Sequence, residues 1–102
     1  MIKKNYQMII SPEAEEELKT SFEFYEQKKT GLGKDLVKEV SKTLDMIVAN
    51  PEQFPRVKKK QIHKASVNRF PFGVYFAVKD YVINVLGVFH YSRNPKLLNK
   101  RF

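Results

Sequence analysis

Residues 73–91, GVYFAVKDYVINVLGVFHY, decide the fold. They contain two runs rich in Val, Ile, Phe and Tyr, at 73–79 and 81–91, on either side of Asp80. Runs of this composition are typical of β-strands, and a short polar interruption between two of them is typical of a hairpin. The stretch therefore predicts two antiparallel strands joined by a tight turn at Asp80.

A third strand is expected at residues 62–67, which alternate weakly between apolar and polar side chains. Between it and the hairpin lies Arg69-Phe70-Pro71-Phe72. This segment interrupts the ladder, because Pro71 has no backbone N–H to donate. The second half of the chain is thus expected to form a three-stranded antiparallel meander.

The first half opens with a short apolar run at residues 6–10, which predicts an N-terminal strand. Ser11-Pro12 follows it and supplies a favoured N-cap with proline at the first helical position. Apolar residues then recur at three- and four-residue spacing, which predicts a helix as far as about Lys29.

A second helix is expected from Leu32 to Ala49, with Asn50-Pro51 as its end. Thr30-Gly31 and Gly33 are interpreted as the residues that break the first helix. Because the connection is so short, the two helices should form an antiparallel hairpin.

Together these elements predict a single α+β domain over residues 1–102. The helical hairpin should pack on one face of a four-stranded sheet made by the N-terminal strand and the meander. Hydrophobic residues make up 42% of the chain, enough for a packed core without cross-links.

The charge is divided unequally between the two halves. Residues 1–52 hold eight lysines against ten acids, a net charge of −2, whereas residues 53–102 hold eleven Lys or Arg and one acid, Asp80, a net charge of +10. These values add to the net charge of +8. A basic half-chain of this kind favours an anionic partner.

Several classes of site are disfavoured by composition. The absence of cysteine excludes disulfides and thiol chemistry, and two histidines are too few for a zinc site of their own, so we expect no metal and no cofactor. The apolar runs are too short to span a membrane, and the N-terminus lacks the apolar core of a signal peptide. We therefore expect a cytoplasmic protein with no membrane partner.

Four segments, in this order and spacing, resemble the RelE/ParE toxin superfamily of type II toxin–antitoxin systems, and more closely its ParE-like branch. They are SPEAEEEL at 11–18, NPEQFP at 50–55, RFPF leading into VYF at 69–76, and LGVFHYSRNP at 86–95. The resemblance implies a growth-inhibiting, plasmid-stabilising toxin that an antitoxin with an acidic C-terminal segment holds inactive, in a complex of two toxins and two antitoxins in many members.

The superfamily contains two activities, and both are kept as alternatives. ParE-like members bind and poison DNA gyrase without known catalysis, and this is the activity that we favour. RelE-like members are ribosome-dependent mRNA endoribonucleases, which would make the chain a metal-independent enzyme. A non-catalytic nucleic-acid-binding module is a further alternative, although the order of elements does not match a double-stranded-RNA domain.

A nuclease would need a base, an acid and cations around the phosphate. No Asp or Glu occurs between Gln53 and Lys79, so a carboxylate base of the RelE type is missing there. The remaining catalytic candidates are Arg69, His90, Tyr91 and Arg93. His90 and Tyr91 can share a cleft only if the strand ends or bulges between them, because neighbouring strand residues point to opposite faces.

The basic run from Arg56 to Lys60 is the leading candidate for contact with a target or an antitoxin. The full set of binding candidates is Arg56, Lys58, Lys59, Lys60, Arg69 and Arg93. His63 is interpreted as an exposed or half-buried strand residue. Lys34, Lys38 and Lys42 are interpreted as a solvated helix face with Asp35, Glu39 and Asp45 nearby, and most of the aromatic residues after 69 as core.

Overall fold

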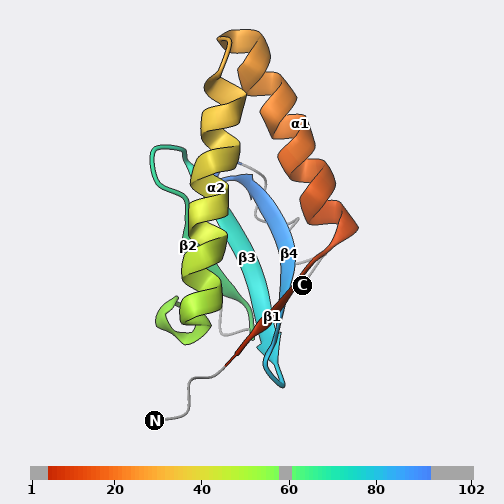
Figure 1. Ribbon diagram of the computed structural model, residues 1–102, viewed down its shortest axis with the longest axis vertical. Helices are drawn as coiled ribbons and strands as arrows, with labels where there is room; N and C mark the ends of the chain where they lie inside the picture. The colour runs from red at the N-terminus through yellow and green to blue at the C-terminus, as the bar shows by residue number, and fades with distance from the viewer. Residues whose placement is uncertain (1–4, 58–60, 93–102) are drawn as a thin grey trace.

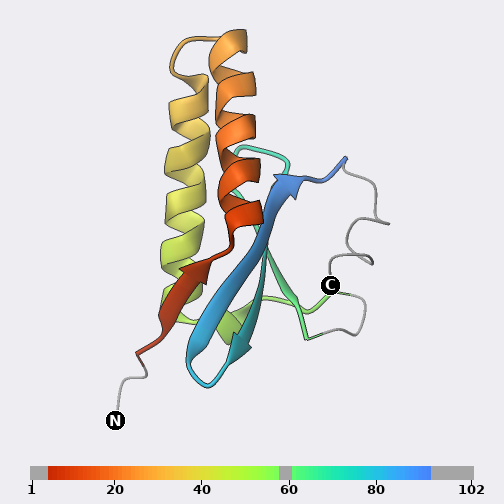
Figure 2. The ribbon, with the colours of Figure 1, turned by 90° about the vertical axis from the view of Figure 1, so that its right-hand side faces the viewer.

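A computed structural model of the chain describes residues 5–57 and 61–92. The elements are β1 (Gln7–Ile10), α1 (Pro12–Lys28), α2 (Leu32–Ala49), a 3-10 turn η1 (Pro51–Gln53), β2 (His63–Ser66), β3 (Phe72–Lys79) and β4 (Val82–His90). The sheet order is β1-β4-β3-β2, with β1 parallel to β4 and the other pairs antiparallel. The two helices lie side by side against one face of this sheet (Figures 1 and 2). The predicted α+β architecture is confirmed.

The start of α1 is determined by local sequence and then fixed to the sheet. Ser11 is the N-cap, and its Oγ accepts a hydrogen bond from the Ala14 N–H at 3.1 Å. The same hydroxyl donates to the Leu86 carbonyl at 3.4 Å. Further along α1, a Glu17 carboxylate oxygen accepts a hydrogen bond from the Val88 N–H at 3.1 Å. The helix thus satisfies backbone groups of β4 beyond the four residues that pair with β1.

The helical hairpin is closed by one carboxylate of α1. Gly31 adopts a left-handed conformation with φ of 91° and offers no side chain to cap α2. Glu26 replaces that cap by accepting hydrogen bonds from the backbone N–H groups of Gly31, Gly33 and Lys34 at 2.9–3.2 Å. These bonds, the one from Gly31 first, hold the pKa of Glu26 below its ordinary value.

Gly33 is not a helix breaker, as the sequence suggested, but a buried residue inside α2. A Cβ atom at this position would lie 2.4 Å from the Phe22 carbonyl oxygen and 2.7 Å from Glu26 Cγ. Glycine is therefore needed because α1 and α2 approach each other closely here.

The core lies between the helical hairpin and the inner face of the sheet, meaning the face that α1 and α2 cover. Its largest fully buried side chains come from α2, β3 and β4: Leu36, Val40, Ile47, Val74, Phe76, Ile83 and Val85. Burying each such side chain stabilises the fold by about 1.5–3 kcal/mol.

The β3–β4 hairpin differs from the sequence prediction in three details. Its turn contains both Asp80 and Tyr81, whose φ angles of 51° and 64° match a two-residue turn that follows the twist of the strands. The pairing then shifts between Tyr75 and Phe76, so that Leu86 is an extra residue in β4. Phe72, expected in the interruption before the hairpin, is the first residue of β3.

In residues 5–57 and 61–92, neither helix combines the length and apolar character that a membrane span requires. A helical turn that the sequence suggests after Pro95 falls outside the described residues.

We predict that Gly33→Ala lowers the free energy of unfolding by about 1–3 kcal/mol, because the added methyl group meets backbone as well as side chain. Urea denaturation followed by circular dichroism would measure the change. Gly31→Asn is the matched control, since asparagine tolerates a left-handed conformation and nothing lies within 4 Å of a Cβ there. Equal stability of wild type and Gly33→Ala would contradict the close approach of the helices.

Candidate interaction site

The sheet face opposite the helices, here called the outer face, carries a second and smaller apolar cluster. Tyr75 and Phe89 stack with ring centroids 4.5 Å apart and an interplanar angle of 11°, and Ile62 packs with them. Val57 and Leu86 flank this group. Burial, and secondly the nearby Tyr91, raise the pKa of Tyr75. The outer face is therefore built on a rigid aromatic floor.

Polar and charged groups lie beside this floor at the end of β4. The Tyr91 hydroxyl donates to Ser66 Oγ at 2.7 Å, and the Lys64 ammonium lies 4.2 Å from the centroid of the Tyr91 ring. Lys64 and Ser66 project from β2 to the same side as Tyr75 and Gly73, their partners on β3. A cation and an exposed phenol thus stand together on the outer face.

Arg56 lies next to β2, where the chain runs antiparallel to that strand. It forms a bridge with His63, the Val57 N–H donates to the Ile62 carbonyl at 2.8 Å, and the Lys64 N–H donates to the Pro55 carbonyl at 3.0 Å. These bonds fix the backbone on both sides of the basic run. Lys58, Lys59 and Lys60 fall outside the described residues.

Arg69 occupies a different part of the molecule, against α2. Its guanidinium lies 3.8 Å from an Asp35 carboxylate oxygen and 3.7 Å from one of Glu39. The residue has a φ of 71°, which is uncommon for a side chain of this size. Arg69 is thus neutralised by the helical hairpin and is not brought together with Arg56 or Tyr91.

Glu39 is a residue whose role the sequence did not reveal. It was expected on the solvated face of α2, but it retains only 5% exposure and lies between Arg69 and Lys42. The sequence did contain a signal for this burial. Glu39 lies three residues after Leu36 and four before Thr43, both buried, so it falls on the buried face of α2. A carboxylate in this setting depends on the cations that face it.

His90 and Tyr91 lie on opposite faces of the sheet. The His90 ring packs on the inner side against Phe72, with centroids 5.4 Å apart, and helps to line a cavity of about 360 Å³ beside Thr20 of α1. Its Nδ1 accepts a hydrogen bond from the Ser92 N–H at 2.9 Å. β4 ends at His90, but the two side chains do not share a cleft.

The described segments contain only part of the basic charge of the second half. Of its eleven Lys and Arg residues, four lie in the described segments: Arg56, Lys64, Arg69 and Lys79. Lys64 lies on the outer face, whereas Arg56 lines a cavity together with its bridge partner His63, and Arg69 faces α2. Arg93 is among the seven that fall outside the described segments. Within 5–57 and 61–92, no group of three or more acidic or histidine side chains could hold a metal ion.

Comparison with known families gives a match over most of the chain. The model of the ParE toxin of type II toxin–antitoxin systems (parDE) matches residues 8–95. No curated protein gives a significant match.

Two solved structures show the same fold at low sequence identity. The chromosomal ParDE toxin–antitoxin system from P. aeruginosa has a chain that is 16% identical, with a TM-score of 0.76 over 85% of this chain and 97% of that chain. A double arginine-to-alanine mutant of the E. coli toxin RelE in the free state is 13% identical, with a TM-score of 0.62 over 95% of this chain and 94% of that chain. The expected resemblance in fold is confirmed.

We predict that Arg69→Ala lowers the free energy of unfolding by about 1–3 kcal/mol, below the range for fully buried pairs because Arg69 is half exposed. Arg69→Ala should lower the free energy of unfolding by less in a Glu39→Gln background, because no buried carboxylate then needs a cation. Chemical denaturation of the four members of this double-mutant cycle measures the coupling. Lys42→Ala is the control, as Lys42 is exposed and an i,i+3 pair of this kind contributes only about 0.2–0.5 kcal/mol. Additive effects of the two substitutions would show that the ion pair does not stabilise the fold.

Proposed function

The chain belongs to the family of ParE toxins of type II toxin–antitoxin systems, and we propose on this basis that it inhibits growth by binding DNA gyrase. A cognate antitoxin with an acidic C-terminal segment would neutralise it. In this proposal the protein acts by occupying its target and catalyses no reaction itself.

The separation of His90 from Tyr91 is the observation that favours binding over RNA cleavage. A metal-free ribonuclease needs its general base and general acid around one phosphate. Here the imidazole lies on the inner side, beside Phe72 and α1, whereas the phenol lies on the outer face beside Lys64. A single phosphate cannot contact both groups across the sheet.

The outer face supports the proposal as an interaction surface. Its stacked aromatic floor offers a rigid apolar centre, and Lys64 adds positive charge beside it. Protein interfaces favour aromatic side chains at such a centre. We assign target contact to Arg56 and Lys64, together with Lys58, Lys59, Lys60 and Arg93, and a supporting role to Arg69 through Glu39.

A partner of opposite charge follows from the same surface. The ParDE structure from P. aeruginosa that shares this fold comes from a toxin–antitoxin system, and we extend that pairing to this chain. An acidic segment that orders on binding would neutralise the cations assigned to target contact. The complex could contain two copies of each protein.

A ribosome-dependent ribonuclease is the second candidate, because the exposed phenol of Tyr91 has a cation only 4.2 Å from its ring. Phenol and cation together could polarise a phosphate ester. His90 would then have no part in the chemistry.

We expect the purified protein to inhibit supercoiling by gyrase in vitro, or to trap gyrase–DNA cleavage complexes, and to leave ribosome-bound mRNA intact. Plasmid supercoiling and toeprinting assays with the same preparation test both candidates. Cleavage of mRNA in the ribosomal A site with gyrase unaffected at saturating protein would reject the gyrase proposal.

We predict that Arg56→Glu raises the concentration needed for half-inhibition of the target by about tenfold, since a cation assigned to target contact becomes an anion. Its thermal stability should stay close to that of wild type, because Arg56 is exposed and makes no ion pair within the described residues. Lys38→Glu on the exposed side of α2 makes the same change in net charge and serves as the control. Equal inhibition by Arg56→Glu and Lys38→Glu would show that overall charge, and not the position of Arg56, governs binding.

A further inference from the structure

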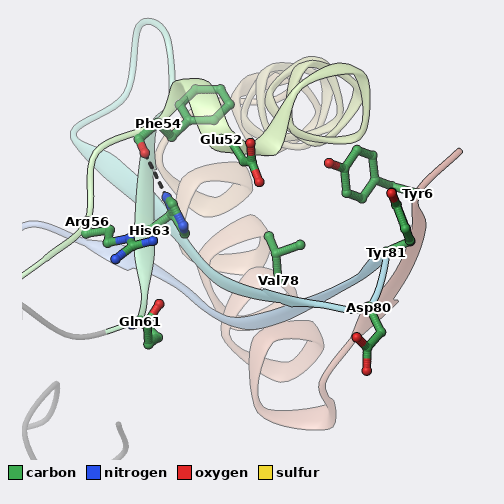
Figure 3. Close-up of a pocket in the computed structure, with 9 residues that line it drawn as sticks. All are labelled: Tyr6, Glu52, Phe54, Arg56, Gln61, His63, Val78, Asp80 and Tyr81. Atoms are coloured by element: carbon green, nitrogen blue, oxygen red, sulfur yellow. Dashed lines mark hydrogen bonds between the residues drawn. The ribbon is translucent and has the colours of Figure 1, made fainter. Parts of the chain in front are cut away.

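A second cavity, of about 630 Å³, lies at the end of the sheet where the β3–β4 turn approaches η1 and the residues before β1. Figure 3 places Val78 on its floor, His63 and Arg56 on one side, Glu52 above, and Tyr6 and Tyr81 on the other side. It is separate from the stacked tyrosine and phenylalanine of the outer face. The proposed function uses one residue of its lining, Arg56, and makes no other use of this cavity.

His63 presents a fixed hydrogen-bond acceptor to the cavity. His63 is only 8% exposed, and its ring stacks on Phe76 with centroids 5.2 Å apart and an interplanar angle of 14°. Nδ1 lies 2.7 Å from the Phe54 carbonyl oxygen, which can only accept, so Nδ1 carries the hydrogen. In the neutral ring Nε2 therefore holds a lone pair, and in Figure 3 this atom faces the space above Val78.

Glu52 supplies a carboxylate to the same space. Within residues 5–57 and 61–92 it makes no ion pair. Its backbone is held in η1, because Pro51 is buried and the Gln53 side-chain amide donates to the carbonyls of Met46 and Asn50. The carboxylate and the Tyr6 hydroxyl both point into the cavity in Figure 3.

Aromatic faces complete the wall. The rings of Tyr6 and Tyr81 lie 5.5 Å apart at an angle of 47°. A planar cation can stack on such rings while its edge donates hydrogen bonds to groups around it. The cavity thus combines the Glu52 carboxylate, an imidazole acceptor and π faces, and Asp80 and Arg56 also line it.

We propose that this cavity is a binding site for a guanidinium group. A guanidinium has five N–H donors in a rigid plane, so it can reach Glu52 and His63 Nε2 from different edges while its face lies against Tyr6. An ammonium group is compact and strongly hydrated, which suits this wide and partly aromatic wall less well. Arg56 lies across the cavity from Glu52 and carries a like charge, so it weakens the binding of any cation.

The test uses Nα-acetyl-L-arginine amide as the probe, titrated into the full-length protein at neutral pH and followed by NMR. The matched control is Nα-acetyl-L-citrulline amide, which has nearly the same shape but no charge. We expect saturable shifts of the His63 ring nitrogens and of the Glu52 and Val78 amides, with a dissociation constant of about 1–10 mM. Binding of the citrulline compound should be at least about tenfold weaker. Equal binding of the two compounds, or shifts elsewhere only, would overturn the proposal.

Three glutamine substitutions identify which side chains bind the arginine probe. Glu52→Gln should weaken binding of the arginine probe about tenfold, and Arg56→Gln should strengthen it severalfold. Lys64→Gln changes the net charge as Arg56→Gln does but lies outside the cavity lining, so it should leave binding unchanged. If Glu52→Gln keeps wild-type affinity while its NMR spectrum stays folded, the carboxylate has no role and the site is rejected.

Free L-arginine and the blocked tripeptide acetyl-Ala-Arg-Ala-amide distinguish two sources of the guanidinium group. Tighter binding of free arginine supports a small-molecule ligand, and tighter binding of the tripeptide supports an arginine side chain of a polypeptide. Failure of both to bind overturns the site. These results do not depend on whether gyrase is the target, because no gyrase is present.

Discussion

Burial of the inner sheet face beneath the α1–α2 hairpin is the constraint on which the rest of the structure depends. Once Val74, Phe76 and Val85 point toward Leu36 and Val40, strand alternation, offset by one residue at Leu86, assigns the remaining side chains of β3 and β4 to a face. The close approach of the helices and the hydrogen bonds of Glu26 keep that cover in a fixed position. The chemistry of each face follows from this one choice of side.

The basic charge of the second half is divided by the same constraint. Lys64 falls on the outer face with Tyr91, whereas Arg69, after a left-handed turn of the backbone, meets the carboxylates of α2. Acids of the first half therefore neutralise one of the cations that the charge pattern marked as a binding candidate. A net charge describes what a surface can attract only after such internal pairs have been subtracted.

A shared fold does not determine whether such a molecule binds or cleaves. The ParDE and RelE structures share this fold, at TM-scores of 0.76 and 0.62, and a fold can carry different functions, so function has to be argued from the groups on the scaffold. On this scaffold the imidazole of His90 and the phenol of Tyr91 lie on opposite sides of β4. The guanidinium site proposed near Glu52 and His63 would place further recognition chemistry away from the outer face.

Local signals in the sequence were sufficient for the helix boundaries, the β3–β4 hairpin and the order of elements, because caps, turns and apolar periodicity act between residues close in the chain. The parallel pairing of β1 with β4, the burial of Glu39 beside Arg69, the need for Gly33 and the cavity around His63 were decided only by tertiary structure. Each of these joins residues distant in sequence, and their contacts depend on how the helical hairpin and the sheet dock. That docking is a property of two packed surfaces, which no short stretch of sequence contains.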